Sequence, residues 1–276
     1  MCISNIYENR INLYKKYHIS FLTPKMYLTQ IESIIIHVLN LDSFRLINCV
    51  IVKKKLIMRV CLITENYDPS YGGQYTAIQN VVNICKFRKI NYFIIHKKSR
   101  IYKSKFLLEK NINNCDIIHL FGGWTFFYLN IFKLGKKLKK KIIIHPMGLF
   151  DPESFKQKRI KKEIAWKLYQ KKMLLGSDLI HCGSYLEEQN LKKLNQKFNT
   201  IVLPFSIDKS DLKNSFSKKL NRRCIFFSRL HKQKGLDRLI QAWKIVADRT
   251  WKLDIVGFGN KNFYEKKFQL HKYKNI

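Results

Sequence analysis

The sequence has few acidic residues and none of the cysteine pairs that usually bind zinc. Of its 276 residues only 19 are Asp or Glu, against 53 Lys or Arg. Its seven cysteines are scattered, their number is odd and no Cys-x-x-Cys pair occurs. Neither a zinc site nor a disulfide framework is therefore indicated. A reduced, cytoplasmic setting fits this cysteine pattern best.

Signals for export or membrane insertion are also missing. Glu8 and Arg10 come early, and no compact apolar core precedes a small-residue cleavage site, as a signal peptide would require. The apolar stretch 31–52 is a poor transmembrane candidate, because it is interrupted by charged or polar residues at Glu32, His37, Asp42 and Arg45. We therefore expect a cytoplasmic protein, and attachment to the inner face of the membrane stays open.

What the sequence does contain is positive charge and enough apolar material for a core. The formal net charge is +34, which favours contact with nucleic acid, an anionic membrane or phosphorylated ligands. The alternative is compositional drift toward Lys, Ile and Asn, which would explain most of the excess without a partner. Apolar residues make up 46% of the chain, enough for a folded core.

The pattern of the chain changes at Met58. Residues 1–57 show irregular apolar patches, whereas 58–65 read as a short buried strand of the kind that begins an α/β domain. Either 1–57 is a genuine helical extension, or Met58 is the natural start and the preceding segment is not native. The clean strand start favours the second interpretation. On either interpretation we expect 1–57 to be dispensable for folding.

From residue 58 onward, short apolar strands alternate with helices, which predicts an α/β fold with a parallel sheet covered on both faces. The alternation predicts one complete Rossmann-like domain over 58–205. A second Rossmann-like domain, 206–276, is predicted to be incomplete. The predicted strands are 60–64, 92–96, 116–120, 141–145, 178–182, 200–203, 224–228 and 252–256, and the predicted helices are 74–87, 124–138, 155–175, 187–195 and 235–247.

Two motifs stand where the carboxyl ends of parallel strands meet, which is where ligands bind in such sheets. Gly72 and Gly73 follow the first strand and let the backbone approach a ligand closely, although a Gly-Gly here is often only a turn. His145 ends the strand that begins at Lys141, so its ring has the position to donate a hydrogen bond to a sugar hydroxyl. An ordinary loop histidine is the alternative.

A basic turn follows the strand 224–228. It holds Arg229 and Lys234, and Gly235 opens an amphipathic helix. Two cations beside a helix N-terminus make a site for a phosphate or diphosphate, because the side chains and unpaired backbone N–H groups converge there. Ordinary helix starts in a lysine-rich chain are the alternative explanation.

Taken together, these motifs resemble the retaining glycosyltransferases of family four, which have the GT-B fold of two Rossmann-like domains. The resemblance covers residues 58–259 and rests mainly on 142–188, with His145-Pro146-Met147-Gly148, Trp166-Lys167-Leu168-Tyr169 and Ser184-x-x-Glu187, and on the basic turn. It implies transfer of a sugar from a nucleotide diphosphate sugar to a glycan or lipid-linked acceptor, as in polysaccharide or lipopolysaccharide biosynthesis.

The resemblance also implies roles for individual residues. His145 would lie against the donor sugar as the catalytic-site histidine, with the Gly72–Gly73 loop beneath the donor. Arg229 and Lys234 would bind the diphosphate and replace a metal, so no cofactor is implied. Gly257 and Gly259 match a Gly-x-Gly turn close to the nucleotide, while Asp151 and Glu187 would order loops around the cleft.

Two departures from the family pattern stand out. Residues 203–208 replace the usual Pro-Asn-Gly-x-Asp segment, and the Glu-x7-Glu element is missing, because Glu265 is the only glutamate after Lys234. We therefore expect a chain truncated in its second domain, with little turnover. A non-catalytic remnant that binds a membrane, glycan or partner protein is the alternative. The sequence does not favour nucleic-acid binding, because no recognition motif accompanies the lysines.

The segment Lys133–Lys172 is the most basic part of the resembling region. It holds fourteen Lys or Arg against three acidic residues. A solvated basic face is one interpretation. Docking to an anionic bilayer is the other, with each basic residue near the surface adding about 1 kcal/mol.

Overall fold

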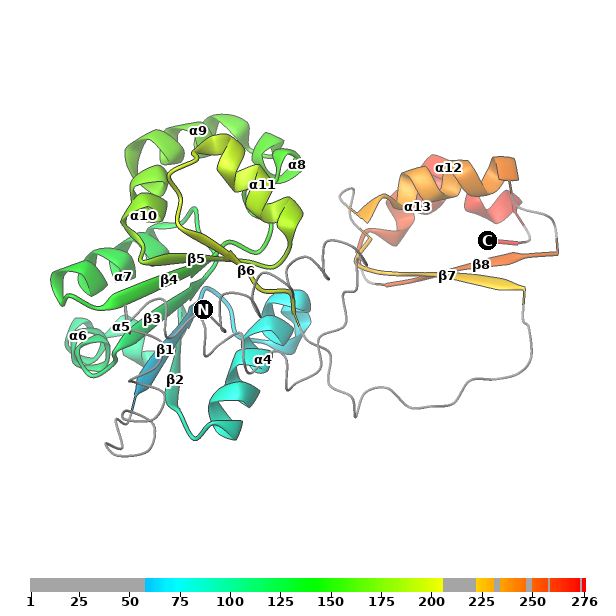
Figure 1. The fold of residues 1–276 in the computed structure, drawn as a ribbon. Coiled ribbons are helices and arrows are strands. Elements are labelled where there is room, and N and C mark those ends of the chain that lie inside the picture. Colours follow the sequence, from blue (N-terminus) through cyan, green and yellow to red (C-terminus); the bar gives the residue numbers. More distant parts are fainter. Residues whose placement is uncertain (1–57, 206–221, 231–233, 247–249, 258, 274) are drawn as a thin grey trace, which may run out of the picture. The chain divides into compact units, whose positions relative to one another are not determined.

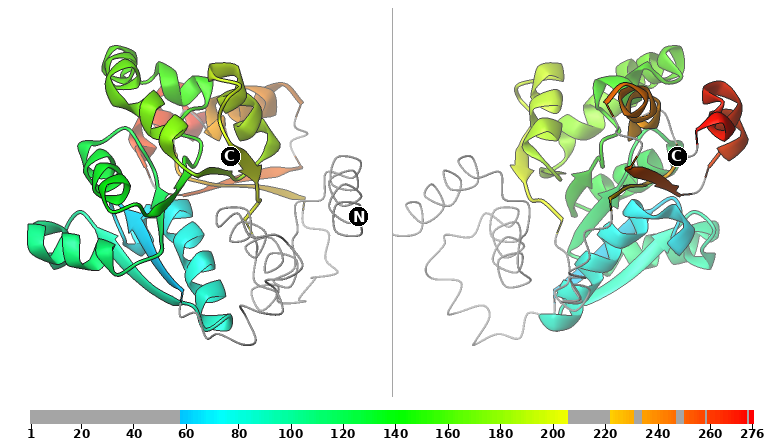
Figure 2. Two further views of the ribbon diagram at one scale, coloured as in Figure 1. Left: turned by 60° about the vertical axis from the view of Figure 1, so that its left-hand side comes forward. Right: turned by 90° about the vertical axis from the view of Figure 1, so that its right-hand side faces the viewer.

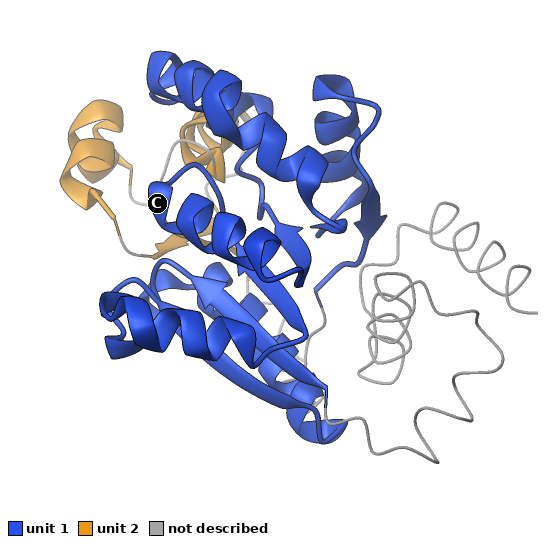
Figure 3. Ribbon diagram, turned by 90° about the vertical axis from the view of Figure 1, so that its left-hand side faces the viewer, with its two compact units in different colours: residues 1–212 blue, residues 213–276 orange. Residues whose placement is uncertain are grey.

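The computed structural model describes residues 58–205, 222–230, 234–246, 250–257, 259–273 and 275–276. The chain divides into two compact units, 1–212 and 213–276 (Figure 3). The sequence interpretation of 1–57 and of the segment 206–221 lies outside the described residues.

The first unit is built on a six-stranded parallel sheet with the order β2-β1-β3-β4-β5-β6 (Figure 1). This confirms the α/β fold class and the parallel sheet. After β1 the chain passes to the edge strand β2 and then returns to the other side of β1 to form β3. The strands are β1 Arg59–Thr64, β2 Asn91–His96, β3 Ile117–Phe121, β4 Lys141–His145, β5 Leu179–Cys182 and β6 Thr200–Val202.

Helices connect these strands. They are α4 Gly73–Phe87, α5 Arg100–Lys103, α6 Lys105–Asn113, α7 Phe126–Lys137, α8 Pro152–Lys156, α9 Arg159–Ala165, α10 Lys171–Gly176 and α11 Tyr185–Leu194, with a 3-10 turn at Pro69–Tyr71 and a π-helix at Trp166–Gln170. Helices α5 and α6 were not predicted. The predicted helix over 155–175 is wrong as a single element, because Lys158 adopts a left-handed conformation (φ 53°) and separates α8 from α9.

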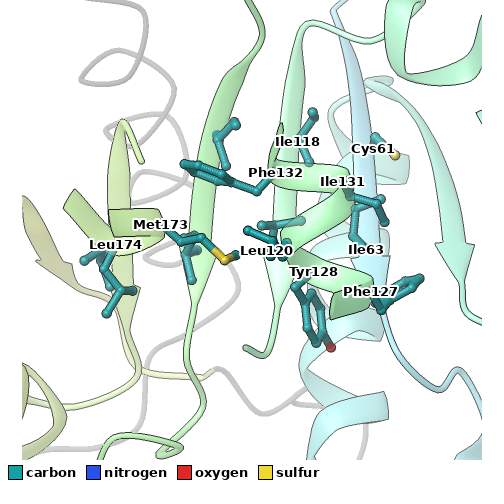
Figure 4. Packing of buried hydrophobic residues seen from close by; sticks show 14 of the residues in the cluster. Cys61, Ile63, Ile118, Leu120, Phe127, Tyr128, Ile131, Phe132, Met173 and Leu174 are labelled. Carbon is teal, nitrogen blue, oxygen red and sulfur yellow. The ribbon is translucent and has the colours of Figure 1, made fainter. Parts of the chain in front are cut away.

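Each face of the sheet has its own apolar core. One core packs α4 against β1, β3 and β4 through residues such as Leu62, Ile78 and Val82. The other packs α6, α7 and α10 on the opposite face, with Leu120, Phe132 and Met173 at its centre (Figure 4). Figure 2 shows α4 and the group of helices around α7 on different sides of the strands. Successive strand residues point to opposite faces, so a strand buried on both sides is apolar throughout.

The second unit has a two-stranded parallel sheet, β7 Arg223–Phe227 with β8 Lys252–Val256. Helices α12 Leu236–Val246 and α13 Lys261–Phe268 accompany it, followed by a 3-10 turn at Leu270–Lys272. Leu236 and Ile240 from α12 pack with Tyr264 and Phe268 from α13 to form its core. Helix α13 was not predicted from the sequence.

Candidate functional site

The loop after β1 brings open backbone to the carboxyl edge of the first sheet. Asp68 caps the 3-10 turn by accepting a hydrogen bond from the Ser70 N–H at 2.9 Å. Gly72 has φ 55° and ψ −118°, a conformation that side chains disfavour, and α4 starts at Gly73. Apart from neighbouring residues of the loop and the helix's own backbone, no atom of the described residues lies within 4 Å of the position that a Cβ would occupy on either glycine. The loop therefore leaves space for a ligand beside the first turn of α4.

Helix α4 is tied to the end of the neighbouring strand. The Gln74 side-chain amide donates a hydrogen bond of 2.9 Å to the carbonyl of Phe121, the last residue of β3. Phe121 is paired in register with His145, the last residue of β4. The sheet thus connects the Gly72–Gly73 loop to His145 through residues that sequence reasoning did not select.

His145 is fully buried, and aromatic rings surround it. The ring of His181, from β5, lies 3.9 Å from it between centroids, and the ring of His119, from β3, lies 6.1 Å away. Phe205 stacks on His145 at 5.2 Å and 20° and is itself 37% exposed. Phe205 therefore covers His145 on one side.

Burial sets the protonation of these three histidines. Removal from water lowers the pKa of His119 and His145 well below the usual value, and the neighbouring histidines add to the effect. Burial also lowers the pKa of His181 to about 4, although its hydrogen bond to Leu203 acts in the opposite direction. All three imidazoles are therefore neutral at pH 7.

His119 and His181 were missed by the sequence analysis. The signal that would have found them is an Ile-His pair near the end of three strands, at 118–119, 144–145 and 180–181. Because alternate residues of a strand share a face, these three pairs place all the imidazoles on one side of the sheet.

Glu187 links the loops that follow β4 and β5. Its two carboxylate oxygens accept hydrogen bonds from the backbone N–H groups of Gly148 at 2.6 Å and Gly183 at 2.7 Å. Burial raises the pKa of the Glu187 carboxyl, and the two N–H donors partly oppose that rise. Asp151 lies in the first of these loops and accepts a hydrogen bond from the Asn190 side chain at 3.1 Å.

The second unit holds the predicted cations and the Gly-x-Gly turn. Arg229 follows β7, Lys234 precedes α12, and both are exposed without a salt bridge to any described residue. A Cβ on Gly257 would lie 1.8 Å from the Ser228 carbonyl oxygen, so only glycine permits this approach. Leu230 forms a β-bridge with Gly259. The turn after β8 therefore lies directly beside Arg229.

Comparison with solved structures gives matches along most of the chain. HepE from Anabaena, in complex with UDP-glucose, matches with a TM-score of 0.57 and 14% identity over 79% of this chain and 66% of HepE. Sucrose-phosphate synthase from Thermosynechococcus elongatus matches with a TM-score of 0.51 and 12% identity, over 78% of this chain and 68% of that protein. The fold is that of a GT-B glycosyltransferase.

No protein-family model matches the sequence, and no curated protein matches it. The chain spans about two thirds of the length of these GT-B structures. Among the residues that the structure describes, no helix combines the length and apolar character needed to cross a bilayer.

Proposed function

We propose that this chain binds a nucleotide diphosphate sugar and belongs to a glycosyltransferase that delivers the sugar to a glycan or lipid-linked acceptor. The observation that carries the proposal is the juxtaposition of Arg229 with the glycine turn after β8. HepE, whose fold this chain shares, is complexed with UDP-glucose in one structure and with UDP in another. The motifs favour the retaining family-four type and a role in polysaccharide or lipopolysaccharide biosynthesis.

The proposed chemistry rests on fixed positive charge. Arg229 and Lys234 bind the diphosphate and stabilise the charge that develops on the departing nucleotide. These cations take the place that a divalent ion would otherwise occupy, so the transfer needs no metal at the diphosphate. Gly257 and Gly259 leave the backbone open to the nucleotide, and Gly72 and Gly73 do the same beneath the donor. His145 faces the sugar once Phe205 has moved aside.

Calorimetric titration with UDP-glucose, GDP-mannose and ADP-glucose tests the donor site. A charge-assisted hydrogen bond contributes about 1.5–3 kcal/mol, so Arg229→Ala and Lys234→Ala should each weaken binding of the preferred donor about tenfold or more. Arg222→Ala is the matched control, because it removes the same charge at the opposite end of β7 and should leave affinity unchanged. Equal affinity in wild type and both site variants would refute the diphosphate site.

The acceptor-side partner that we propose is an anionic membrane surface. Three apolar side chains at a four-residue spacing project into solvent from α9 and the π-helix: Ile160 is 74% exposed, Ile164 54% and Leu168 67%. Basic residues flank them at Lys158, Arg159, Lys161, Lys167, Lys171 and Lys172, all exposed. Exposed apolar side chains bordered by lysine suit the interface of an anionic bilayer.

Vesicle co-sedimentation tests this surface. Wild-type protein should pellet with vesicles that contain phosphatidylglycerol and much less with phosphatidylcholine alone, and salt should weaken the binding. The triple variant Ile160→Ser, Ile164→Ser and Leu168→Ser should lose most of it. Phe106→Ser, which changes an equally exposed side chain on α6, is the control. Undiminished sedimentation of the triple variant would rule out this surface.

A further inference from the structure

Three histidines on the neighbouring strands β3, β4 and β5 form a compact group of metal-ligating side chains. One ring nitrogen of each histidine can serve as a ligand, and these three nitrogens lie within 4.8 Å of one another. All three residues are buried. No other group of this kind occurs among the residues that the structure describes. Adjacent parallel strands hold them, so the backbone positions are fixed by the sheet itself.

Four of the six ring nitrogens in this group lack a protein partner among the described residues. Nε2 of His119, both ring nitrogens of His145 and Nδ1 of His181 are buried without a hydrogen bond to any described residue. Buried polar atoms in proteins are almost always paired. A neutral imidazole carries one N–H and one lone pair, so each of the three rings can offer one lone pair. The unpaired nitrogens on one face of the sheet therefore point to a ligand that accepts one lone pair from each histidine.

His181 already has the outer contact typical of a metal ligand. Its Nε2 lies 2.9 Å from the Leu203 carbonyl oxygen, which can only accept a hydrogen bond. Nε2 therefore carries the proton, and the lone pair of the neutral ring is on Nδ1. Metal-binding histidines commonly donate their second ring N–H to a backbone carbonyl in this way, because that contact fixes the tautomer and the ring orientation.

We propose that His119, His145 and His181 bind one divalent transition-metal ion of the Zn²⁺ class. Zinc takes three histidine ligands at about 2.0–2.1 Å with a fourth position open, so its ligand nitrogens are about 3.4 Å apart. The three nitrogens lie within 4.8 Å of one another, so the rings must move closer together, and the closely packed rings of His145 and His181 must turn, to reach this geometry. The ion would join the three strands beside Leu203 and Phe205. His145 is also the ring that we propose to face the donor sugar; an ion held by one of its nitrogens would leave the N–H on the other nitrogen for that contact. The proposed diphosphate contacts are made by other residues, Arg229 and Lys234.

The test uses the full chain, freed of metal with EDTA and then titrated with Zn²⁺ and with Co²⁺. Wild-type protein should bind one equivalent of Zn²⁺, and binding should raise its melting temperature. Bound Co²⁺ should give the visible absorption of a nitrogen-ligated, four-coordinate ion without thiolate charge transfer in the near ultraviolet. His181→Gln, His145→Gln and His119→Gln should each weaken Zn²⁺ binding by about a hundredfold or more.

Two histidines outside the group give matched controls. His96→Gln, at the end of β2, and His271→Gln, near the C-terminus, should bind Zn²⁺ as the wild type does. Absence of binding by the folded wild-type chain would overturn the proposal, as would equal affinity in all three site variants. Thiolate charge transfer in the wild-type Co²⁺ spectrum would also overturn it, even if a variant failed to fold, because cysteines would then hold the ion. Calorimetric titration of the EDTA-treated protein with the nucleotide sugars measures donor binding without the ion. Failure of the metal proposal can therefore be told apart from failure of the proposed transferase function.

Discussion

The hydroxyl group of Tyr128 places the loop that holds Gly72 and Gly73. It is buried near the start of α7, where it donates a hydrogen bond of 2.6 Å to the Phe121 carbonyl and accepts one of 3.0 Å from the Glu65 N–H. One oxygen thus joins the end of β3 to the beginning of the loop after β1. Burial raises the pKa of this phenol, so it stays protonated and able to donate.

Tyr128→Phe should therefore destabilise the first unit. The change leaves the Glu65 N–H without its acceptor, while the Phe121 carbonyl keeps the hydrogen bond from Gln74. An unpaired buried group costs about 1–3 kcal/mol. Urea unfolding followed by circular dichroism measures the loss. Tyr102→Phe is the control, because its ring packs on Phe127 while its hydroxyl has no hydrogen bond within the described part of the chain. Equal stability of the two variants would contradict this role.

Glu187 gives a second test at the same scale. Replacing it by Gln puts an amide NH2 opposite one of the two N–H groups, so either Gly148 or Gly183 loses its acceptor. We expect a loss of about 1–3 kcal/mol in the free energy of unfolding. Glu188→Gln should change stability much less, since Glu188 contacts the Thr200 hydroxyl, which can donate equally well to an amide oxygen. If Glu187→Gln has the same free energy of unfolding as the wild type, the hydrogen bonds from Gly148 and Gly183 to Glu187 do not stabilise the two loops.

At the scale of a single helix, α12 illustrates how amphipathic pattern determines packing. Leu236 and Ile240 are fully buried on one side, and Ile245 is 84% exposed. Truncating a buried isoleucine costs about 2–5 kcal/mol, so Ile240→Ala should unfold the small second unit. Ile245→Ala should leave it intact. Amide hydrogen exchange resolved along the chain should show protection lost over 223–268 in the first variant and unchanged in the second.

Strongly periodic elements were predictable from the sequence, and lysine-rich ones were not. The strand 141–145 has three consecutive isoleucines between Lys141 and His145, and the structure has it at the predicted bounds. The segment 155–175 looks like one helix, because its break is a left-handed lysine at 158 that carries no glycine or proline signal. Helices α5 and α6 were missed because their apolar residues are sparse between lysines.

In the candidate site, too, some residues could be predicted from the sequence and others could not. Gly257 stands out in the sequence as part of a Gly-x-Gly turn, and the structure adds that its close approach to Ser228 permits only glycine. Its contact with a nucleotide stays a prediction. The grouping of His119 with His181 was not, since 61 residues separate them in the sequence and only the strand order β3-β4-β5 brings them together. The stacking of Phe205 on His145 could not be predicted either, because it depends on the path of the chain after β6.

For the whole molecule, the first unit should fold from residues 58–205 alone. Both of its apolar cores and all six strands lie within that range. The fragment should be soluble, show mixed α/β circular dichroism and unfold cooperatively in urea. If the fragment is insoluble while the full-length chain is soluble, residues outside 58–205 are needed for the first unit to fold.

The all-parallel sheet has a consequence for how this chain folds during synthesis. Parallel neighbours cannot be joined by a tight hairpin, so each strand pair forms only after the intervening crossover has been made. Strand β1 pairs on one side with β2 and on the other with β3, so its last neighbour arrives only at residue 121. Until then a strand whose centre, residues 60–63, is apolar has an unpaired edge on the ribosome. Slow translation or an early pause within 65–116 would therefore prolong exposure to chaperones and to aggregation.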